Sequence, residues 1–313
     1  MHYRERKQLK SIALKFWPNI ISPRLRKSFK NRIGEVLPTD RIQEQKSIAT
    51  LSAIEPYVFL RVKNEEETLP LTLNSIKSIC NRGVIGYNDC TDHSEEIIIS
   101  WCHAHPQFKP FKYPYSVIPA GSKEYLKINK CSKNTLASYY NAVLDIIPKN
   151  EWILKIDADQ IYFPNILKHS FTLPRDALDW VSYSRLDLLR VGFDFYVLNY
   201  LRPGDHFLIY NQDLYFENVS GYKPDGTFYA YEMLKKGNGK FPKLHIPWRP
   251  ECSSIHLPFE KKYRAHTPPR SLKIPLDYYL NSCDRTQFSD EFIAEILKER
   301  QKLASILMRD SIL

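Results

Sequence analysis

Short apolar runs alternate along the chain with stretches in which apolar residues recur every three or four positions. The runs at 57–62, 83–87, 115–118 and 152–156 indicate buried strands, because β-branched and aromatic side chains fit a covered, pleated surface. Strands that alternate with helices predict βαβ units, and hence an α/β fold with a mostly parallel central sheet flanked by helices.

Three helices are predicted between these strands. Their apolar faces are marked by Leu69, Leu73, Ile76 and Cys80, by Ile97, Ile98, Trp101 and Cys102, and by Leu136, Tyr140, Val143 and Ile147. We expect Asn64 to cap the first helix, since its side chain can accept a hydrogen bond from the first turn. The acidic run at 65–67 would then lie favourably at the positive end of the helix dipole.

Both ends of the chain predict amphipathic helices. The apolar positions are Leu9, Ile12, Ala13, Phe16 and Trp17, then Leu25, Phe29 and Ile33, and near the C-terminus Phe292, Ile296, Leu303, Ile306 and Leu307. Pro18 ends the first of these helices, and the polar stretch 38–50 indicates a linker. The C-terminal helix could join the N-terminal one on a membrane, or lie on a partner subunit of a homo-oligomer.

The net charge of +10 is concentrated at the N-terminus. Residues 1–32 hold ten Lys and Arg against Glu5 alone, a charge of +9, which leaves +1 for the rest of the chain. A basic amphipathic helix binds an anionic membrane surface with about 1 kcal/mol per cation near the surface. The alternative is that this helix packs on the body of the protein. The near-neutral body lacks the basic groove of a nucleic-acid enzyme, so we expect no nucleic-acid partner.

The sequence predicts a cytoplasmic protein that is peripheral on the cytoplasmic face of the inner membrane. No apolar stretch of about eighteen residues is present, which argues against a spanning helix. Pro18 and Pro23 interrupt any signal-peptide core. The six cysteines form no C-x-x-C pair, which is typical of apolar fillers in a reducing compartment.

Two carboxylates, Asp157 and Asp159, follow the strand predicted at 152–156. Residues i and i+2 of an extended chain point to the same side, so both carboxylates could face one point at the carboxyl end of the strand. Their repulsion favours a hard divalent cation, and open α/β sheets bind ligands beyond that end. No glycine-rich phosphate loop occurs, so a metal-bridged diphosphate site is predicted. The alternative is a solvated loop whose Asp side chains cap a turn.

Four segments in this order resemble family-2-like glycosyltransferases of the GT-A fold. Val58–Thr68 (VFLRVKNEEET) is similar to their first strand and Asn-Glu-Glu turn. Tyr87–Asp92 (YNDCTD) resembles their DDGSTD segment, which holds the uridine, and Ala137–Leu144 (ASYYNAVL) resembles their ARNxGL helix. Asp157–Asp159 stands where their metal-binding D-x-D belongs. More loosely, the length, the basic N-terminus and IHLPFEKKYR at 255–264 resemble bacterial β-1,4-N-acetylgalactosaminyltransferases of lipooligosaccharide synthesis.

This resemblance implies a set of nucleotide-sugar contacts. They are Arg61, Asn64 and Glu66, then Asn88, Asp89 and Asp92, then Asn141 and Asp157, with Lys262 or Arg264 as a charge clamp on the diphosphate. Asn88 replaces a carboxylate of DDGSTD, and Tyr140 stands where the helix usually has Arg or Asn, which concerns nucleoside contacts rather than the fold. The implied division of the chain is a basic segment and linker at 1–50, a nucleotide-sugar half at 51–165, an acceptor half at 166–275 and a helical segment at 276–313.

The expected metal is Mn²⁺ or Mg²⁺, because carboxylate, phosphate and water oxygens suit these ions. Asp159 is the leading ligand, with Asp157 binding through water or contacting the ribose. The resemblance implies that a downstream His returns to the metal, and His256 is our candidate; an ordinary, partly buried histidine is the alternative.

Three carboxylates are candidates for the catalytic base. In the resembling family it is a Glu or Asp that opens a helix in the acceptor half, and the stretch 229–235 fits that context, so Glu232 is the first candidate. Asp205, in the stretch RPGDH, is the second and Asp213 the third.

The resemblance implies a metal-dependent, inverting glycosyltransferase. It would move a hexose or N-acetylhexosamine from a UDP-sugar to an oligosaccharide or glycolipid acceptor such as lipooligosaccharide. Two alternatives remain open: a metal-dependent nucleotidyltransferase, and a non-catalytic basic protein that binds membranes or nucleic acid.

Overall fold

The computed structural model describes residues 54–258 with gaps at 121, 123, 130, 192–193, 238–243 and 248–252, and beyond them only 274–276 and positions 294 and 298. The amphipathic helices predicted at the two ends, and the side chains of Lys262 and Arg264, lie outside the described residues. The described part belongs to the unit Ala53–Leu313. Among its helices, none has the length and hydrophobicity that crossing a bilayer requires.

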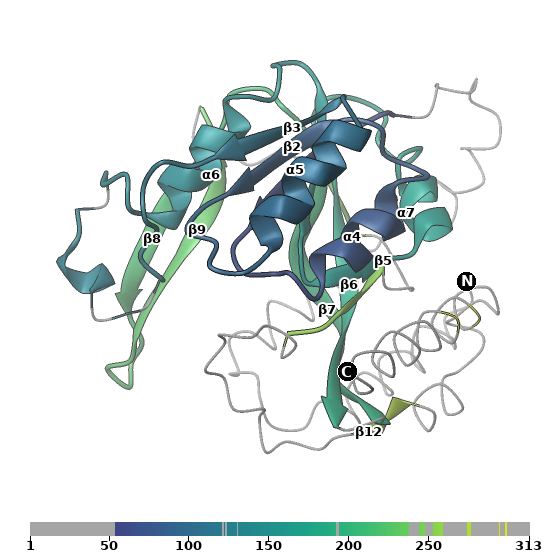
Figure 1. Ribbon diagram of the computed structural model, residues 1–313. Helices are drawn as coiled ribbons and strands as arrows, with labels where there is room; N and C mark the ends of the chain where they lie inside the picture. The colour runs from purple at the N-terminus through teal and green to yellow at the C-terminus, as the bar shows by residue number, and fades with distance from the viewer. Residues whose placement is uncertain are drawn as a thin grey trace, which may run out of the picture. The chain divides into compact units, whose positions relative to one another are not determined.

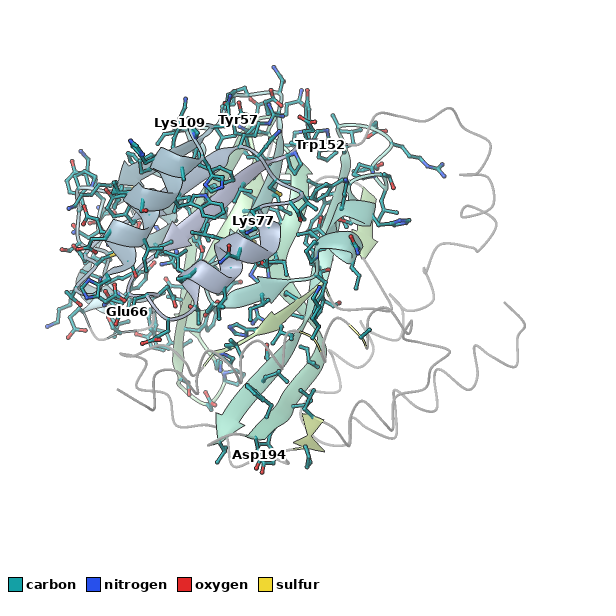
Figure 2. All side chains as sticks on the ribbon, turned by 45° about the vertical axis from the view of Figure 1, so that its right-hand side comes forward. Tyr57, Glu66, Lys77, Lys109, Trp152 and Asp194 are labelled. Atoms are coloured by element: carbon teal, nitrogen blue, oxygen red, sulfur yellow. The ribbon has the colours of Figure 1, made fainter. Side chains whose placement is uncertain are left out.

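Four parallel strands form the first part of the central sheet. In spatial order they are β3 (Phe108–Lys112), β2 (Gly83–Tyr87), β1 (Tyr57–Val62) and β4 (Trp152–Asp157). Figure 2 shows Tyr57 and Trp152, the first residues of β1 and β4, at one end of the sheet and Glu66, which follows β1, at the other. The loops that follow these strands therefore share one edge, where a ligand site of an α/β sheet is expected.

The sheet continues from β4 with mixed neighbours. They are β7 (Asp194–Tyr210), β6 (Asp179–Val191), β11 (Ser254–His256) and β5 (Gln160–Tyr162), while β10 (Leu244–Pro247) pairs with β6 and β12 (Ile274–Pro275) with β7. The β4–β7, β7–β6 and β11–β5 pairs are antiparallel, and the β6–β11 pair is parallel. The α/β prediction is confirmed; the parallel order holds for the first four strands, and the described sheet as a whole is mixed.

Within the described residues, side chains alternate across the sheet and fill cores on its two faces. Val58, Leu60 and Val62 pack with α4 (Leu69–Ile76), α5 (Ser94–Ala104) and α7 (Pro164–Ser170) on one face. Phe59 packs with α6 (Leu136–Leu144) on the other face, where the hairpin of β8 (Leu214–Tyr222) and β9 (Phe228–Lys236) adds a further layer. In Figure 1, α6 and this hairpin lie together at the left of the view.

Asn141 joins α6 to the hairpin. Its Nδ2 donates to the carbonyl oxygen of Phe216 at 2.9 Å, and its Oδ1 accepts from the N–H of Phe216 at 2.7 Å. The helical context predicted for 229–235 is wrong, because this stretch forms most of strand β9. Its period is two: Glu232 and Leu234 share one face, and Tyr231 and Met233 share the other.

Two local predictions upstream are also corrected. The third strand is Phe108–Lys112 rather than 115–118; Pro110 at its centre weakened the strand pattern, yet an edge strand tolerates proline. Helix α4 begins after Thr68 rather than Asn64, because Pro70 is suited to a first helical turn, where an N–H is not needed. Asn64 instead adopts a left-handed conformation with φ 55°.

Candidate active site

The two aspartates of the D-x-D stand at the end of β4 and in the turn to β5. Asp159 is 7 % exposed, and the Asp157 side chain is 24 % exposed. The Tyr162 hydroxyl lies near both aspartates. It accepts a hydrogen bond from the backbone N–H of Asp157 at 3.1 Å, and the negative charges of both carboxylates disfavour its ionisation. Burial, and after it these two carboxylates, raise the pKa of Tyr162 well above its ordinary value.

Two basic side chains form ion pairs with Asp157. Lys155 Nζ lies 3.3 Å from its Oδ1, and His206 Nε2 lies 2.8 Å from its Oδ2. Burial alone would raise the pKa of Asp157, but Lys155 and His206, together with Arg61, lower it well below the ordinary range. Asp157 is therefore a fixed negative charge at the edge of the sheet.

Asp159 is paired with His256 from β11. The Nε2 atom of His256 lies 3.3 Å from Asp159 Oδ2, and its Nδ1 lies 2.8 Å from Asp187 Oδ1. Arg185 Nε in turn donates to Asp187 at 3.0 Å. Burial would lower the pKa of His256, but Asp159 and Asp187 raise it above its ordinary value. The structure thus brings the predicted ligands Asp159 and His256 side by side.

Lys155, His206 and Asp187 were not identified from the sequence as parts of this site. Lys155 offers a weak signal, since it is a charge within an apolar strand run and is only 2 % exposed in the structure. Its ammonium lies 5.4 Å from the ring centre of Tyr140 and 6.0 Å from that of Phe207. His206 and Asp187 reach the site through strand pairing, which no local pattern reveals.

The loops after β1 and β2 are bonded to each other. Asn64 Oδ1 accepts the N–H of Thr91 at 2.8 Å. Asp92 Oδ2 accepts the N–H of Glu66 at 3.1 Å, and Glu66 Oε2 accepts the N–H of His93 at 3.1 Å. The two loops are thus held together by three predicted nucleotide contacts, Asn64, Glu66 and Asp92, and form one side of the candidate site.

Asn88 and Asp89 stand at the tip of β2. Asn88 is fully buried, and its Nδ2 donates to Asp89 Oδ2 at 3.2 Å. Within the described part of the chain, Asn88 Oδ1 has no hydrogen-bond partner. Asp89 has φ 44° and forms an ion pair with Lys63 at 3.3 Å. The buried acceptor at Asn88 is suited to a ligand that brings an N–H donor.

Arg61 lies on β1 in register with Asp157. Its guanidinium lies 5.4 Å from the ring centre of Tyr140 and 6.0 Å from that of Tyr139. Arg61 is half-buried, and its charge helps to lower the pKa of Asp157, so the guanidinium lies near that carboxylate. The nucleotide-contact role predicted for Arg61, and that for Asn141, stay predictions.

Glu232 is half-buried on β9, directly opposite Asn218 of β8. Burial raises the pKa of Tyr140 to about 12. The negative charges of Glu232 and Asp157 also raise this pKa. Glu232 and Asp157 therefore both lie near Tyr140. Asp205 is part of β7, and its side chain lies outside the described residues; Asp213 has φ 53° before β8.

The donor set fits a hard cation that is shared with a ligand. No cluster of three or more His, Cys, Asp and Glu side chains forms a metal site within the described ranges. Asp159 and His256 would provide two ligands, and Mg²⁺ or Mn²⁺ is commonly bound by one or two protein groups together with substrate phosphates and water. Asp187 behind His256 is the outer carboxylate that such a histidine ligand usually has.

Comparisons with known proteins identify one family. The model of the family described as beta-1,4-N-acetylgalactosaminyltransferase (CgtA) matches residues 22–303. No protein of curated function matches the chain.

Solved structures give weaker likenesses. One is glucosyl-3-phosphoglycerate synthase from Mycobacterium tuberculosis with Mn²⁺, UDP and phosphoglyceric acid, at 14% identity and TM-score 0.30, covering 44% of each chain. Its complex with Mg²⁺ and UDP has the same identity and TM-score and covers 49% of this chain and 48% of that one. GalNAc-T7 with UDP, GalNAc and Mn²⁺ has 11% identity and TM-score 0.33, covering 74% and 40%. The chain thus spans less than half the length of these proteins, and the fold assignment here rests on the strand order itself.

Proposed function

The chain belongs to the β-1,4-N-acetylgalactosaminyltransferase family, whose model covers residues 22–303, and from this premise we propose that it is a metal-dependent, inverting glycosyltransferase. Its donor is a UDP-sugar that carries a hexose or N-acetylhexosamine, and its acceptor is a cell-surface glycan such as lipooligosaccharide. The observation that carries the proposal is the contact between Asp159 and His256 at 3.3 Å, beside the ionised Asp157.

The nucleoside would lie against the tip of β2. Asn88 Oδ1, a buried acceptor, would receive the imide N–H of uracil once its side chain turns toward the ligand, because no surface of Asn88 is exposed in the structure. The bonded loops of Asn64 and Asp92 provide a rigid wall, which reduces the ordering cost of binding. Arg61 adds positive charge near the diphosphate.

Asp159 and His256 would hold Mn²⁺ or Mg²⁺, with Asp157 bound through water or on the ribose. An ion held there would supply positive charge to neutralise the charge that develops on the departing diphosphate. Asp187 holds Nδ1 of His256, which leaves Nε2 directed at Asp159. Lys155 and His206 keep Asp157 ionised.

Glu232 is the proposed base. It would accept the proton of the acceptor hydroxyl while the hydroxyl oxygen bonds to the anomeric carbon from the face opposite the nucleotide. The bond between that carbon and the β-phosphate oxygen breaks, and its electron pair leaves with UDP. Asp205 is the second candidate for the base.

We also propose that the protein binds the cytoplasmic face of the inner membrane. Support comes from the ten Lys and Arg of residues 1–32. Sedimentation with anionic vesicles should show binding that is lost when residues 1–32 are deleted. Binding that persists after this deletion would refute the membrane proposal.

The transferase proposal is tested by UDP release from a panel of UDP-sugars with Mn²⁺. We expect slow release that is lost with EDTA and in Asp159→Ala. Asp145→Asn is a matched control, because Asp145 is an exposed acidic residue at the end of α6, and it should keep full activity. Equal release by Asp159→Ala would remove the D-x-D from the mechanism. Pyrophosphate release from a nucleoside triphosphate would instead indicate a nucleotidyltransferase.

A further inference from the structure

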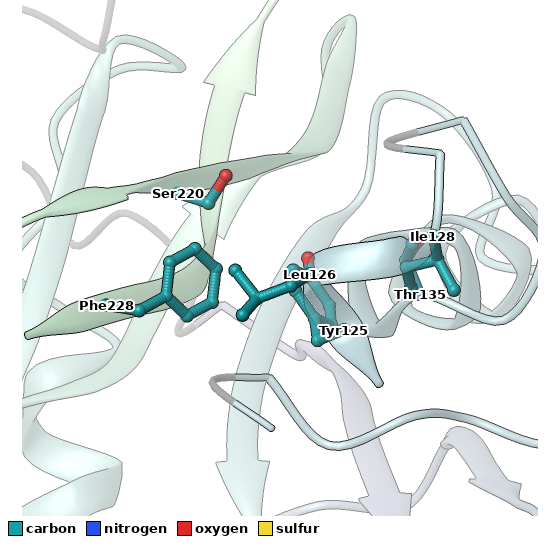
Figure 3. Close-up of a pocket in the computed structure, with 6 residues that line it drawn as sticks. All are labelled: Tyr125, Leu126, Ile128, Thr135, Ser220 and Phe228. Atoms are coloured by element: carbon teal, nitrogen blue, oxygen red, sulfur yellow. The ribbon is translucent and has the colours of Figure 1, made fainter. Parts of the chain in front are cut away.

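A pocket lies between the short helix η1 (Tyr125–Lys127) and the β8–β9 hairpin. Its volume is about 140 Å³, and its lining residues are Tyr125, Leu126, Ile128, Thr135, Ser220 and Phe228. Figure 3 shows the ring of Phe228 on β9 and the side chain of Leu126 directed toward one another, with Ser220 on the neighbouring strand. An engineered cavity of roughly 150 Å³ holds benzene, so this space is suited to one six-membered ring.

The lining is uncharged and amphipathic. Tyr125 and Phe228 are tilted rings 6.5 Å apart, and rings of this kind pack against the C–H face of a neutral ligand. The Ser220 hydroxyl lines the pocket and can bond to a ligand hydroxyl. A neutral ring with one apolar face and several hydroxyl groups fits this lining, whereas a phosphate would meet no cation in it.

The pocket is connected to the proposed base. Tyr125 Oη donates to Asn218 Oδ1 at 3.0 Å, and Asn218 stands opposite Glu232 in the hairpin register. Ser220 lies two residues beyond Asn218, on the same face of β8. Asn218 Nδ2 also donates to Thr135 Oγ1 at 3.0 Å, so Asn218 is hydrogen-bonded to two of the residues that line the pocket, Tyr125 and Thr135. The charge of Glu232, after burial, raises the pKa of Tyr125, which places Glu232 near the pocket wall.

We propose that this pocket binds a pyranose ring of the acceptor glycan, next to Glu232. The inference rests on the proposed function and adds the acceptor subsite to it. A further aromatic ring lies next to the pocket toward solvent: Tyr222 is 67 % exposed and packs edge-to-face on Phe228, with ring centres 5.4 Å apart. Tyr222 therefore supports the next sugar of an acceptor of two or more residues.

The test compares acceptors of different length. The unaltered protein is first assayed with methyl glycosides of glucose, galactose and N-acetylglucosamine, and with disaccharides that end in the same sugars. One monosaccharide and one disaccharide that form product are then taken as the acceptor pair. Phe228→Ala should raise KM about tenfold for both acceptors of the pair. Tyr222→Ala should raise KM for the disaccharide and leave the monosaccharide unchanged. KM for the UDP-sugar and UDP release without acceptor should stay at the unaltered level in both variants.

Tyr215→Ala is the matched control, because Tyr215 is a 38 % exposed tyrosine on the other face of the same hairpin. It should leave both acceptor KM values unchanged. Phe228→Leu keeps the apolar volume and removes the ring, so a raised acceptor KM in this variant, with Tm unchanged, separates ring packing from misfolding.

The outcomes separate the two proposals. Unchanged acceptor KM in Phe228→Ala and Phe228→Leu overturns the acceptor subsite while UDP release continues. Loss of UDP release in Phe228→Leu at unchanged Tm also overturns it, since the pocket would then serve the donor. If the unaltered protein uses no UDP-sugar or no glycoside of the panel, the proposed function itself fails, and the acceptor subsite fails with it.

Discussion

His256 Nε2 lies 3.3 Å from Asp159 Oδ2, although 97 positions separate the two residues in the sequence. Strand β11 brings them together, because it lies between β5, which follows Asp159, and β6, which carries Asp187. A nitrogen and a carboxylate oxygen at this separation suit neighbouring ligands of one hard cation.

Replacing Asp187 with Asn should weaken metal binding. The neutral amide cannot hold the Nδ1–H of His256 as strongly, and loss of such outer carboxylates commonly costs 10- to 100-fold in metal affinity, so we expect about tenfold or more. Titration of Mn²⁺ by electron paramagnetic resonance, in the presence of UDP, measures this directly. Asp145→Asn should bind Mn²⁺ normally, and equal affinity in Asp187→Asn would show that Asp187 does not orient the histidine.

Lys155→Met should destabilise the fold. The change leaves Asp157 without its buried ammonium, and breaking a buried pair from one side costs about 3 kcal/mol, the lower end of the usual range because His206 remains. Urea unfolding measures the loss. The double variant Lys155→Met with Asp157→Asn should recover a large part of it, since the uncompensated charge is then absent. A double variant as unstable as the sum of both singles would contradict this coupling.

Asp92 should stabilise the protein only while it is ionised. Burial would raise its pKa, but the N–H and hydroxyl of Ser94 and the N–H of Glu66 lower it below the ordinary 3.8. A carboxylate with a depressed folded pKa stabilises above its unfolded pKa, and this contribution is lost as pH falls through the folded pKa. Stability should therefore decline below about pH 4, and Asp92→Asn should lose about 1 kcal/mol at pH 7. The difference between the two proteins should narrow at pH 3; a constant difference would argue against this linkage.

Gly86→Ala should disturb the contact between β2 and α6. A Cβ at Gly86 overlaps Val143 Cγ2 and lies 3.2 Å from the Tyr139 ring. Overpacking of this kind costs about 1–3 kcal/mol, which thermal unfolding would detect. The compensating change Val143→Ala in the same chain should restore part of the stability. No effect of Gly86→Ala would mean that α6 moves freely away from the sheet.

The local elements follow from patterns that span a few residues. Runs such as 57–62 and 152–156 read as strands because a buried strand needs only apolar neighbours in sequence. The D-x-D at the end of β4 was found for the same reason, since both carboxylates lie within three positions. Where a local signal was mixed, as at Pro110 or in 229–235, the prediction was wrong.

The sequence by itself determined the α/β class, most of the strands and helices between positions 57 and 157, the D-x-D and His256 as a candidate. Only the tertiary structure decided that His256 contacts Asp159, that Lys155 and His206 hold Asp157, and that Glu232 stands near the pocket of Phe228. The physical reason is the range of the interactions. Strand and helix formation depends on near neighbours, whereas these contacts depend on which distant strands pair and in which register.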